Sequence, residues 1–351
     1  MKTTLLTAAL AALPGTLAAP QKSPPKPPAR ELGLNQLAKR AGLLYFGTAI
    51  DNPSLNQTAY LKIAYDNKDF GQVTPANGQK WMYIEPERNV FNFTMGDQIM
   101  KPAKKNGQLR RCHTFLWHNQ LPDWLTTKNY TKTELLSILE NHIKHEAQYY
   151  HNDCYAWDVA NEAFEDDGTW RKTLWLDGIG PDYLEYAFKY ARKYVSRQTR
   201  LYYNDYNVER VNNKSIAIRD MVKSFQKKGV PIDGIGFQGH FTVARAPTYE
   251  EISASIAQFN KLGLEVAITE LDVRMTLPND ATKTAQQARA YGDAVKACVN
   301  AKDCVGVTVW DFWDPVSWVP GWFEGEGDAT LYSANFTKKA AYYAVVDVLK
   351  A

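Results

Sequence analysis

From residue 45 onward the chain alternates short, β-prone apolar runs with longer amphipathic segments. Strands are expected at residues 45–49, 71–74, 109–115, 155–160, 201–204, 234–238, 266–269 and 305–310. Helices are expected at residues 133–150, 183–196, 215–228, 249–262 and 284–299. Strand–helix alternation calls for a parallel sheet, and no Gly-rich dinucleotide loop follows the first strand. Eight strands in roughly 300 residues therefore predict an α/β fold, a single (β/α)8 TIM barrel.

Two of the predicted strands end on a glutamate, Glu162 and Glu270. A carboxylate at the end of a buried strand does not contribute to packing of the core. Barrels of this class have their catalytic residues at the carboxyl ends of the strands. For one isolated glutamate, a solvated strand end would be the better interpretation. Two glutamates facing one cleft are the pair that glycoside hydrolysis requires. The other strand ends also collect polar and aromatic residues: Lys80, Trp81, Trp117, His118, Asn161, Asn204, Asp205, Tyr206, Gln238, His240, Asp272 and Trp310.

These strand ends resemble those of the family 10 glycoside hydrolases, best known as endo-1,4-β-xylanases. The resemblance runs from about residue 43 to the C-terminus. Seven segments carry it: TPANGQKW at 74–81, HTFLWHNQLP at 113–122, WDVANE at 157–162, YNDYN at 203–207, IDGIGFQGH at 232–240, ITELD at 268–272 and TVW at 308–310. It implies that Glu162 is the general acid/base and Glu270 the nucleophile, with retention of anomeric configuration.

The resemblance implies further roles. Asn161 would hydrogen-bond the sugar 2-OH, His240 would orient Glu270, and Asp272 would hold the His240 tautomer. Two residues keep a structural alternative, because His240 could be a satisfied core histidine and Trp117 could be half core. The expected substrate-binding residues are Asn77, Lys80, His113, Trp117, Asn161, Tyr206, Gln238, His240, Trp310 and Trp318.

Two departures from the family pattern bear on the substrate. Ala76 occupies a position where many xylanases have a Glu, which helps to bind the second sugar unit from the cleaved bond. The chain after Trp310 is also more aromatic than in most members, and these rings are either loop core or an apolar wall for a hydrophobic aglycone. The leading expectation is endo-hydrolysis of 1,4-β-xylosidic linkages in xylan. The second is tomatinase-like removal of an oligosaccharide from a steroidal glycoalkaloid, and the third is an inactive carbohydrate-binding barrel.

The N-terminus predicts secretion. Residues 1–19 have the charged start, apolar run and small residues of a signal peptide, and residues 20–40 form a Pro-rich spacer or a propeptide. Lys39-Arg40 is either a dibasic processing site or the charged end of a small amphipathic segment. The catalytic domain is expected at residues 41–351. No later run is long and apolar enough for a membrane helix, so we expect an extracellular protein.

Secretion permits disulfides, and the four cysteines allow three pairings. We expect Cys112–Cys154, in strand-like runs that could be neighbours, and Cys298–Cys304, which bracket a short polar turn. Five sequons are candidates for N-glycosylation: Asn56, Asn92, Asn129, Asn213 and Asn335.

The expected partner is a polysaccharide or oligosaccharide, bound by a monomer. A net charge of +3 is too small to indicate nucleic acid or an anionic membrane. The six His and four Cys show no metal-ligand spacing, so we expect no metal and no cofactor.

Overall fold

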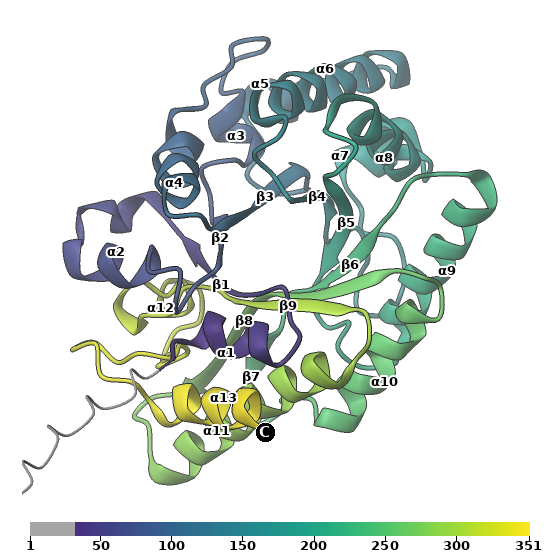
Figure 1. The fold of residues 1–351 in the computed structure, drawn as a ribbon. Coiled ribbons are helices and arrows are strands. Elements are labelled where there is room, and N and C mark those ends of the chain that lie inside the picture. The colour runs from purple at the N-terminus through teal and green to yellow at the C-terminus, as the bar shows by residue number, and fades with distance from the viewer. Residues whose placement is uncertain (1–31) are drawn as a thin grey trace, which may run out of the picture. The chain divides into compact units, whose positions relative to one another are not determined.

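The structure is a computed structural model that describes residues 32–351 of the 351-residue chain. Parallel strands in the order β8-β6-β5-β4-β3-β2-β1-β9 form a barrel, and the pairing of β8 with β9 closes it (Figure 1). The predicted TIM barrel is confirmed. Its strands are β1 (Tyr45–Ile50), β2 (Gln72–Pro75), β3 (Leu109–Leu116), β4 (Ala156–Asn161), β5 (Arg200–Asp205), β6 (Gly234–Phe237), β8 (Glu265–Thr276) and β9 (Cys304–Val309).

Helices connect successive strands and surround the barrel (Figure 1). The five helices predicted from amphipathic periodicity are α6 (Lys132–Tyr150), α8 (Tyr183–Tyr194), α9 (Asn213–Lys228), α10 (Tyr249–Asn260) and α11 (Ala281–Asn300). The amphipathic segment that was one interpretation of the chain up to Arg40 is the helix α1 (Leu34–Arg40). The prediction missed α2 (Thr58–Ala64), α3 (Trp81–Ile84), α4 (Thr94–Lys105), α5 (Asp123–Thr126), α7 (Leu174–Ile179), α12 (Val319–Trp322) and α13 (Ala340–Lys350). Two 3-10 turns, η1 (Asn52–Asn56) and η2 (Asp314–Val316), follow β1 and β9.

Local sequence explains where the long helices begin and end. Thr131 and Thr248 start α6 and α10 by accepting hydrogen bonds from backbone N–H groups three residues on, and a glutamate at that position completes each capping box. Gly229 ends α9 with a φ of 67°, a left-handed conformation that glycine adopts at little cost. β1 and β4 are buried along their whole length, as expected for parallel strands covered on both faces.

The seventh barrel strand is longer than predicted. Residues 266–269 were expected as a strand ending at Glu270, but β8 continues through Glu270 and Asp272 to Thr276. Beyond the barrel it pairs with two short strands, β7 (His240–Thr242) in parallel and β10 (Glu326–Gly327) antiparallel. Glu270 therefore lies within a strand that is anchored beyond the barrel, whereas Glu162 directly follows the last residue of β4.

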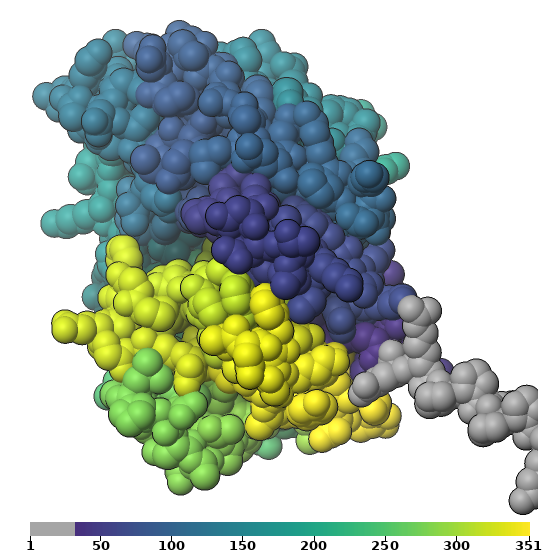
Figure 2. All heavy atoms as spheres, turned by 90° about the vertical axis from the view of Figure 1, so that its left-hand side faces the viewer, coloured from purple at the N-terminus to yellow at the C-terminus, as the bar shows by residue number. Residues whose placement is uncertain are grey.

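The two ends of the described chain meet on the outside of the barrel. α1 packs on β1 and α13, and Figure 2 shows residues near the start of the described chain against its last residues. Leu34 and Leu37 of α1 are buried, while Lys39 and Arg40 are exposed. α1 thus lies in the segment predicted as spacer or propeptide, and the boundary at residue 41 and processing at Lys39-Arg40 stay predictions. The predicted signal peptide, residues 1–19, lies outside the described residues.

Disulfides join Cys112 of β3 to Cys154, just before β4, and Cys298 of α11 to Cys304 of β9. These are the pairs expected from the sequence. The asparagines of all five sequons are exposed. Within residues 32–351, no helix is both long and apolar enough to cross a membrane.

Candidate active site

Glu162 is turned into the barrel mouth by an unusual backbone conformation. Its φ is 57°, in the left-handed region that non-glycine residues seldom occupy. Its N–H donates to the carbonyl oxygen of Asn204 at 3.0 Å, which ties this conformation to the end of β5. Strain of this kind is found at functional sites, where surrounding contacts hold it in place.

Three donors fix the Glu162 carboxyl group. The indole Nε1 of Trp117 donates to Oε2 at 2.9 Å. The amides of Asn161 and Gln238 donate to Oε1, at 3.0 and 2.9 Å. The half-buried group is thus held in one orientation by side chains at the carboxyl ends of β3, β4 and β6.

Glu270 lies deeper and has different partners. The residue is 5 % exposed, its Oε1 accepts from Asn204 Nδ2 at 2.7 Å, and its Oε2 lies 3.2 Å from His240 Nε2. Burial by itself raises its pKa, but the hydrogen bond with His240 and the electrostatic influence of His113 and His240 bring the pKa of Glu270 below its ordinary value. Glu270 is therefore ionised over the neutral range.

His240 connects Glu270 to Asp272. Its Nδ1 lies 2.9 Å from Asp272 Oδ2, so the cationic ring donates to both carboxylates. Burial by itself lowers the pKa of His240, but the charge of Asp272 and the hydrogen bonds to both carboxylates raise it to about 10. Trp318 donates to the same Asp272 oxygen at 2.7 Å.

Two amides link the carboxyl groups to each other. Asn204 Nδ2, besides contacting Glu270, lies 2.9 Å from Asn161 Oδ1, and Asn161 Nδ2 contacts Glu162. Thr269 fixes the orientation of the Asn204 amide by donating to its Oδ1 at 2.7 Å. The chain Glu270–Asn204–Asn161–Glu162 joins both glutamates into one hydrogen-bonded unit.

Lys80 forms the polar edge of the site beside β2. Its Nζ donates to Asn77 Oδ1 at 2.9 Å and Gln120 Oε1 at 2.7 Å, and lies 4.7 Å from the ring centre of Trp117. Burial lowers the pKa of Lys80 to about 8, although the Glu270 and Glu162 carboxylates act in the opposite direction. Asn77 in turn donates to Asp51 Oδ2 at 2.8 Å.

His113 is held from inside the barrel. Its Nδ1 lies 3.0 Å from Asp158 Oδ2, and the same oxygen accepts from Arg111 Nε at 3.2 Å. Burial by itself raises the pKa of Asp158, but the Arg111 charge and the contacts with His113 lower it below its ordinary value. A buried ion pair thus fixes the His113 ring.

Two tryptophan rings form a wall beside β1 and β2. Trp310 is 8 % exposed and packs with Ala49, Ala76 and Trp318. Its ring stands nearly perpendicular to that of His113, with the centres 5.6 Å apart. Trp310 directly follows β9, which was predicted to include it.

Tyr206 follows β5 and is held by two cations. Its hydroxyl accepts from Arg171 at 2.7 Å, and Lys214 Nζ lies 3.5 Å from its ring centre. Lys214 pairs with the buried Asp205 at 2.8 Å. These charges fix the Tyr206 ring beside the Glu162 loop, to which Arg171 also donates through the Glu162 carbonyl at 2.9 Å.

The sequence analysis assigned no role to three residues of the site: Gln120, Asp158 and Asn204, which it named only among the polar strand ends. All three stand in the segments that carried the family resemblance. A charged residue in the middle of an apolar strand was the available signal for Asp158. Gln120 gave no comparable signal. The position of Asn204 at a strand end marked it as polar, but its function depends on partners far away in sequence.

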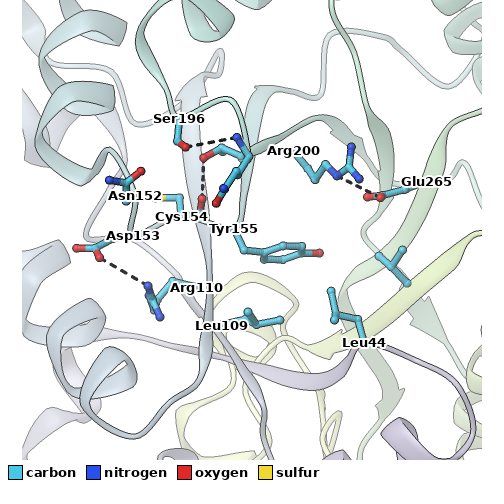
Figure 3. A pocket seen from close by; sticks show the side chains of 13 residues that line it. Leu44, Leu109, Arg110, Asn152, Asp153, Cys154, Tyr155, Ser196, Arg200 and Glu265 are labelled. Carbon is cyan, nitrogen blue, oxygen red and sulfur yellow. Dashed lines mark hydrogen bonds and ion pairs between the residues drawn. The ribbon is translucent and has the colours of Figure 1, made fainter.

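A separate pocket of about 370 Å³ lies at the amino-terminal end of the barrel (Figure 3). None of its lining residues belongs to the predicted site. Its charged groups are paired, Arg110 with Asp153 at 3.6 Å and Arg200 with Glu265 at 3.3 Å. Amino-terminal faces of such barrels serve stability rather than chemistry, so we place the active site at the opposite end of the strands.

The barrel and its linked pair of glutamates define the class of protein, a (β/α)8 glycoside hydrolase. The sequence profile described as glycosyl hydrolase family 10 matches residues 33–348. The chain belongs to this family.

Named relatives agree with this assignment. The chain is 46% identical over 313 residues to endo-1,4-beta-xylanase D of Talaromyces funiculosus, covering 89% of this chain and 76% of that protein. It is 44% identical over 327 residues to endo-1,4-beta-xylanase A of Humicola insolens, covering 91% and 87%. Among solved structures, the endo-1,4-beta-xylanase XylE of Penicillium canescens has a TM-score of 0.89 at 43% identity, with 91% of this chain and 98% of that chain covered.

Proposed function

We propose that this protein is a secreted endo-1,4-β-xylanase that cleaves xylan by double displacement, with retention of configuration. The observation that carries the proposal is the difference between the two linked glutamates. Glu270 is buried, ionised and oriented by His240, as a nucleophile must be, whereas Glu162 is half-buried at the end of β4. Relatives of the same family that are more than 40% identical bear the name endo-1,4-beta-xylanase.

In the first step, the Glu270 carboxylate attacks the anomeric carbon and Glu162 gives its proton to the leaving glycosidic oxygen. The bond between carbon and leaving oxygen breaks as the glycosyl ester of Glu270 forms. His240 keeps Glu270 ionised before the attack, since the cation favours the charged carboxylate.

In the second step, Glu162 takes a proton from water, and the resulting nucleophile displaces Glu270 from the sugar. Two inversions at one carbon give net retention. Asn161, which contacts Glu162 and Asn204, is the residue we assign to the sugar 2-OH, an interaction that strengthens in the transition state. Lys80, His113 and Trp310 line the position of the sugar unit whose anomeric carbon Glu270 attacks.

One alternative substrate has structural support. Tomatinase-like removal of an oligosaccharide from a steroidal glycoalkaloid would use the same glutamates, and the exposed ring of Trp322 suits an apolar aglycone. An inactive carbohydrate-binding barrel is disfavoured, because both glutamates are present, with Asn161 in contact with Glu162 and His240 in contact with Glu270.

The test is incubation of the purified protein with xylan and, separately, with a steroidal glycoalkaloid. We expect xylo-oligosaccharides of several lengths from xylan and little reaction with the glycoalkaloid. In Glu162→Ala, azide should restore turnover of an activated aryl glycoside, because a small anion can attack the glycosyl ester without base assistance. Glu270→Ala should stay inactive, or invert, under the same conditions. Release of an intact oligosaccharide from the glycoalkaloid, with xylan untouched, would favour the alternative.

A further inference from the structure

A row of three tryptophans leads from the catalytic centre to the surface. Trp310 and Trp318 pack together beside Ala76, and both rings stand edge-on to His240, with centres 6.4 and 5.0 Å from it. The third ring, Trp322, lies 6.4 Å from that of Trp318. The row is therefore continuous with the residues that orient Glu270.

Trp322 differs from the other aromatic residues that follow Trp310. Phe312 is fully buried, and Trp313 stacks on Phe336 with ring centres 4.4 Å apart. The Phe323 ring is covered by the Arg274 guanidinium, 3.9 Å from its centre. These three rings belong to the loop core or are covered, whereas Trp322 is 70 % exposed.

An exposed tryptophan forgoes the stabilisation that burial of so large a side chain provides. The backbone beneath it is nevertheless well anchored. Val319 at the start of α12 is fully buried, and its carbonyl accepts from the Phe323 N–H at 2.8 Å. The following strand β10 pairs with β8, and Glu326 of β10 forms an ion pair with Arg274 at 2.6 Å. The turn holds Trp322 in place without covering its ring.

We propose that Trp322 is a substrate-binding platform that stacks on a β-1,4-linked xylopyranose unit outside the catalytic position. Xylopyranose presents flat C–H faces to an indole ring, and it carries no hydroxymethyl group to obstruct close approach. The site is an extension of the Trp310–Trp318 wall, one ring further from Glu270. This proposal rests on the proposed xylanase function and adds a specificity-determining residue to it.

The test compares Trp322→Ala with Trp322→Phe and with Tyr343→Ala. Tyr343 is a matched control, since it is 51 % exposed but lies on the outer helix α13. For each protein, kcat/KM is measured on xylohexaose and on an aryl β-xylobioside. The ratio of the two values reports the contacts that only the longer substrate makes. Circular dichroism and the thermal midpoint verify that each variant is folded.

We expect Trp322→Ala to lower this ratio by about 3- to 10-fold, the size of a single aromatic contact. Trp322→Phe should retain much of the ratio, and Tyr343→Ala should leave it unchanged. An unchanged ratio in Trp322→Ala would overturn the proposal. So would a selective loss of activity on a steroidal glycoalkaloid, which would assign the ring to an apolar aglycone. A wild type that cleaves neither xylo-substrate would instead refute the proposed function.

Discussion

The ring of His240 holds Glu270 through Nε2 at 3.2 Å and is itself held through Nδ1 by Asp272 at 2.9 Å. The charge on the ring depends on Asp272, whose carboxylate is the largest influence that raises the pKa of His240 to about 10. Since that charge keeps Glu270 ionised, Asp272 acts on the reaction without touching the sugar.

Asp272→Asn should therefore narrow the pH profile on its alkaline side. Without the carboxylate, the pKa of His240 moves from about 10 toward its ordinary value of about 6.5, so the ring loses its charge between these pH values. We expect kcat/KM at pH 8 to fall by on the order of tenfold, and to change less at pH 5. The measurement is kcat/KM from pH 4 to 10, with the exposed Asp220→Asn as control. A profile lowered equally at every pH would show that Asp272 has a structural role only.

The lowered pKa of Lys80 predicts that substrate binding also weakens at alkaline pH. Its ammonium group is charged below its pKa of about 8 and loses its proton above it, so KM for xylotriose should rise as the pH passes that value. Lys80→Gln should have a raised KM at pH 6 and no further rise up to pH 9. A rise of the same steepness in Lys80→Gln would assign the effect to another group.

Asp311 links stability to pH. The residue is buried, the Tyr60 hydroxyl donates to it, and burial raises its pKa to about 8, against about 3.9 in an unfolded chain. A raised folded-state pKa contributes stability below pH 4 that is lost as the pH rises toward 8, by up to about 1.4 kcal/mol per pH unit. Asparagine can adopt the φ of 61° that Asp311 has, so the substitution Asp311→Asn adds no backbone strain. The free energy of unfolding of Asp311→Asn should therefore increase relative to that of the wild type as the pH rises. Urea unfolding at pH 5 and pH 8 measures this, and an equal difference at both values contradicts it.

Ala76 offers a gain-of-function test. It packs beside Trp310 and precedes Asn77, whose Oδ1 accepts from Lys80, and the family resemblance implies that this position faces the glycone. Ala76→Glu should supply a polar anchor and raise kcat/KM on xylo-oligosaccharides by about tenfold, the size of one hydrogen bond to a charged group. A bulky branched glycoside should gain nothing. Equal effects on the two substrates would mean that position 76 faces no sugar.

Much of the fold could be predicted because strands and amphipathic helices leave local periodicity. The segment of α1 was left open between a propeptide and an amphipathic segment, since the burial of Leu34 and Leu37 depends on α13, at the other end of the chain. The predicted strand ended before Glu270 because a carboxylate inside a strand is unusual. Only the pairing of β8 with β7 and β10 explains why β8 extends further.

In the candidate site too, some residues could be identified from the sequence and the roles of others could not. Glu162 and Glu270 could be identified because each follows an apolar run within a longer motif. Asn204 was named only as a polar strand end, and its role as the amide between the two glutamates could not be predicted, since that role exists only where β4, β5 and β8 meet. Likewise, the exposed Trp322 and the covered Phe323 are adjacent in sequence and differ only in their three-dimensional surroundings.

The proposed division of labour between Glu162 and Glu270 is tested by the configuration of the first product. Proton NMR follows the anomeric signals while the wild-type protein cleaves a xylo-oligosaccharide. Double displacement through a Glu270 ester predicts that the β-anomer appears first and converts to the α-anomer only by mutarotation. Initial appearance of the α-anomer would show inversion and would contradict the assignment of Glu270 as nucleophile.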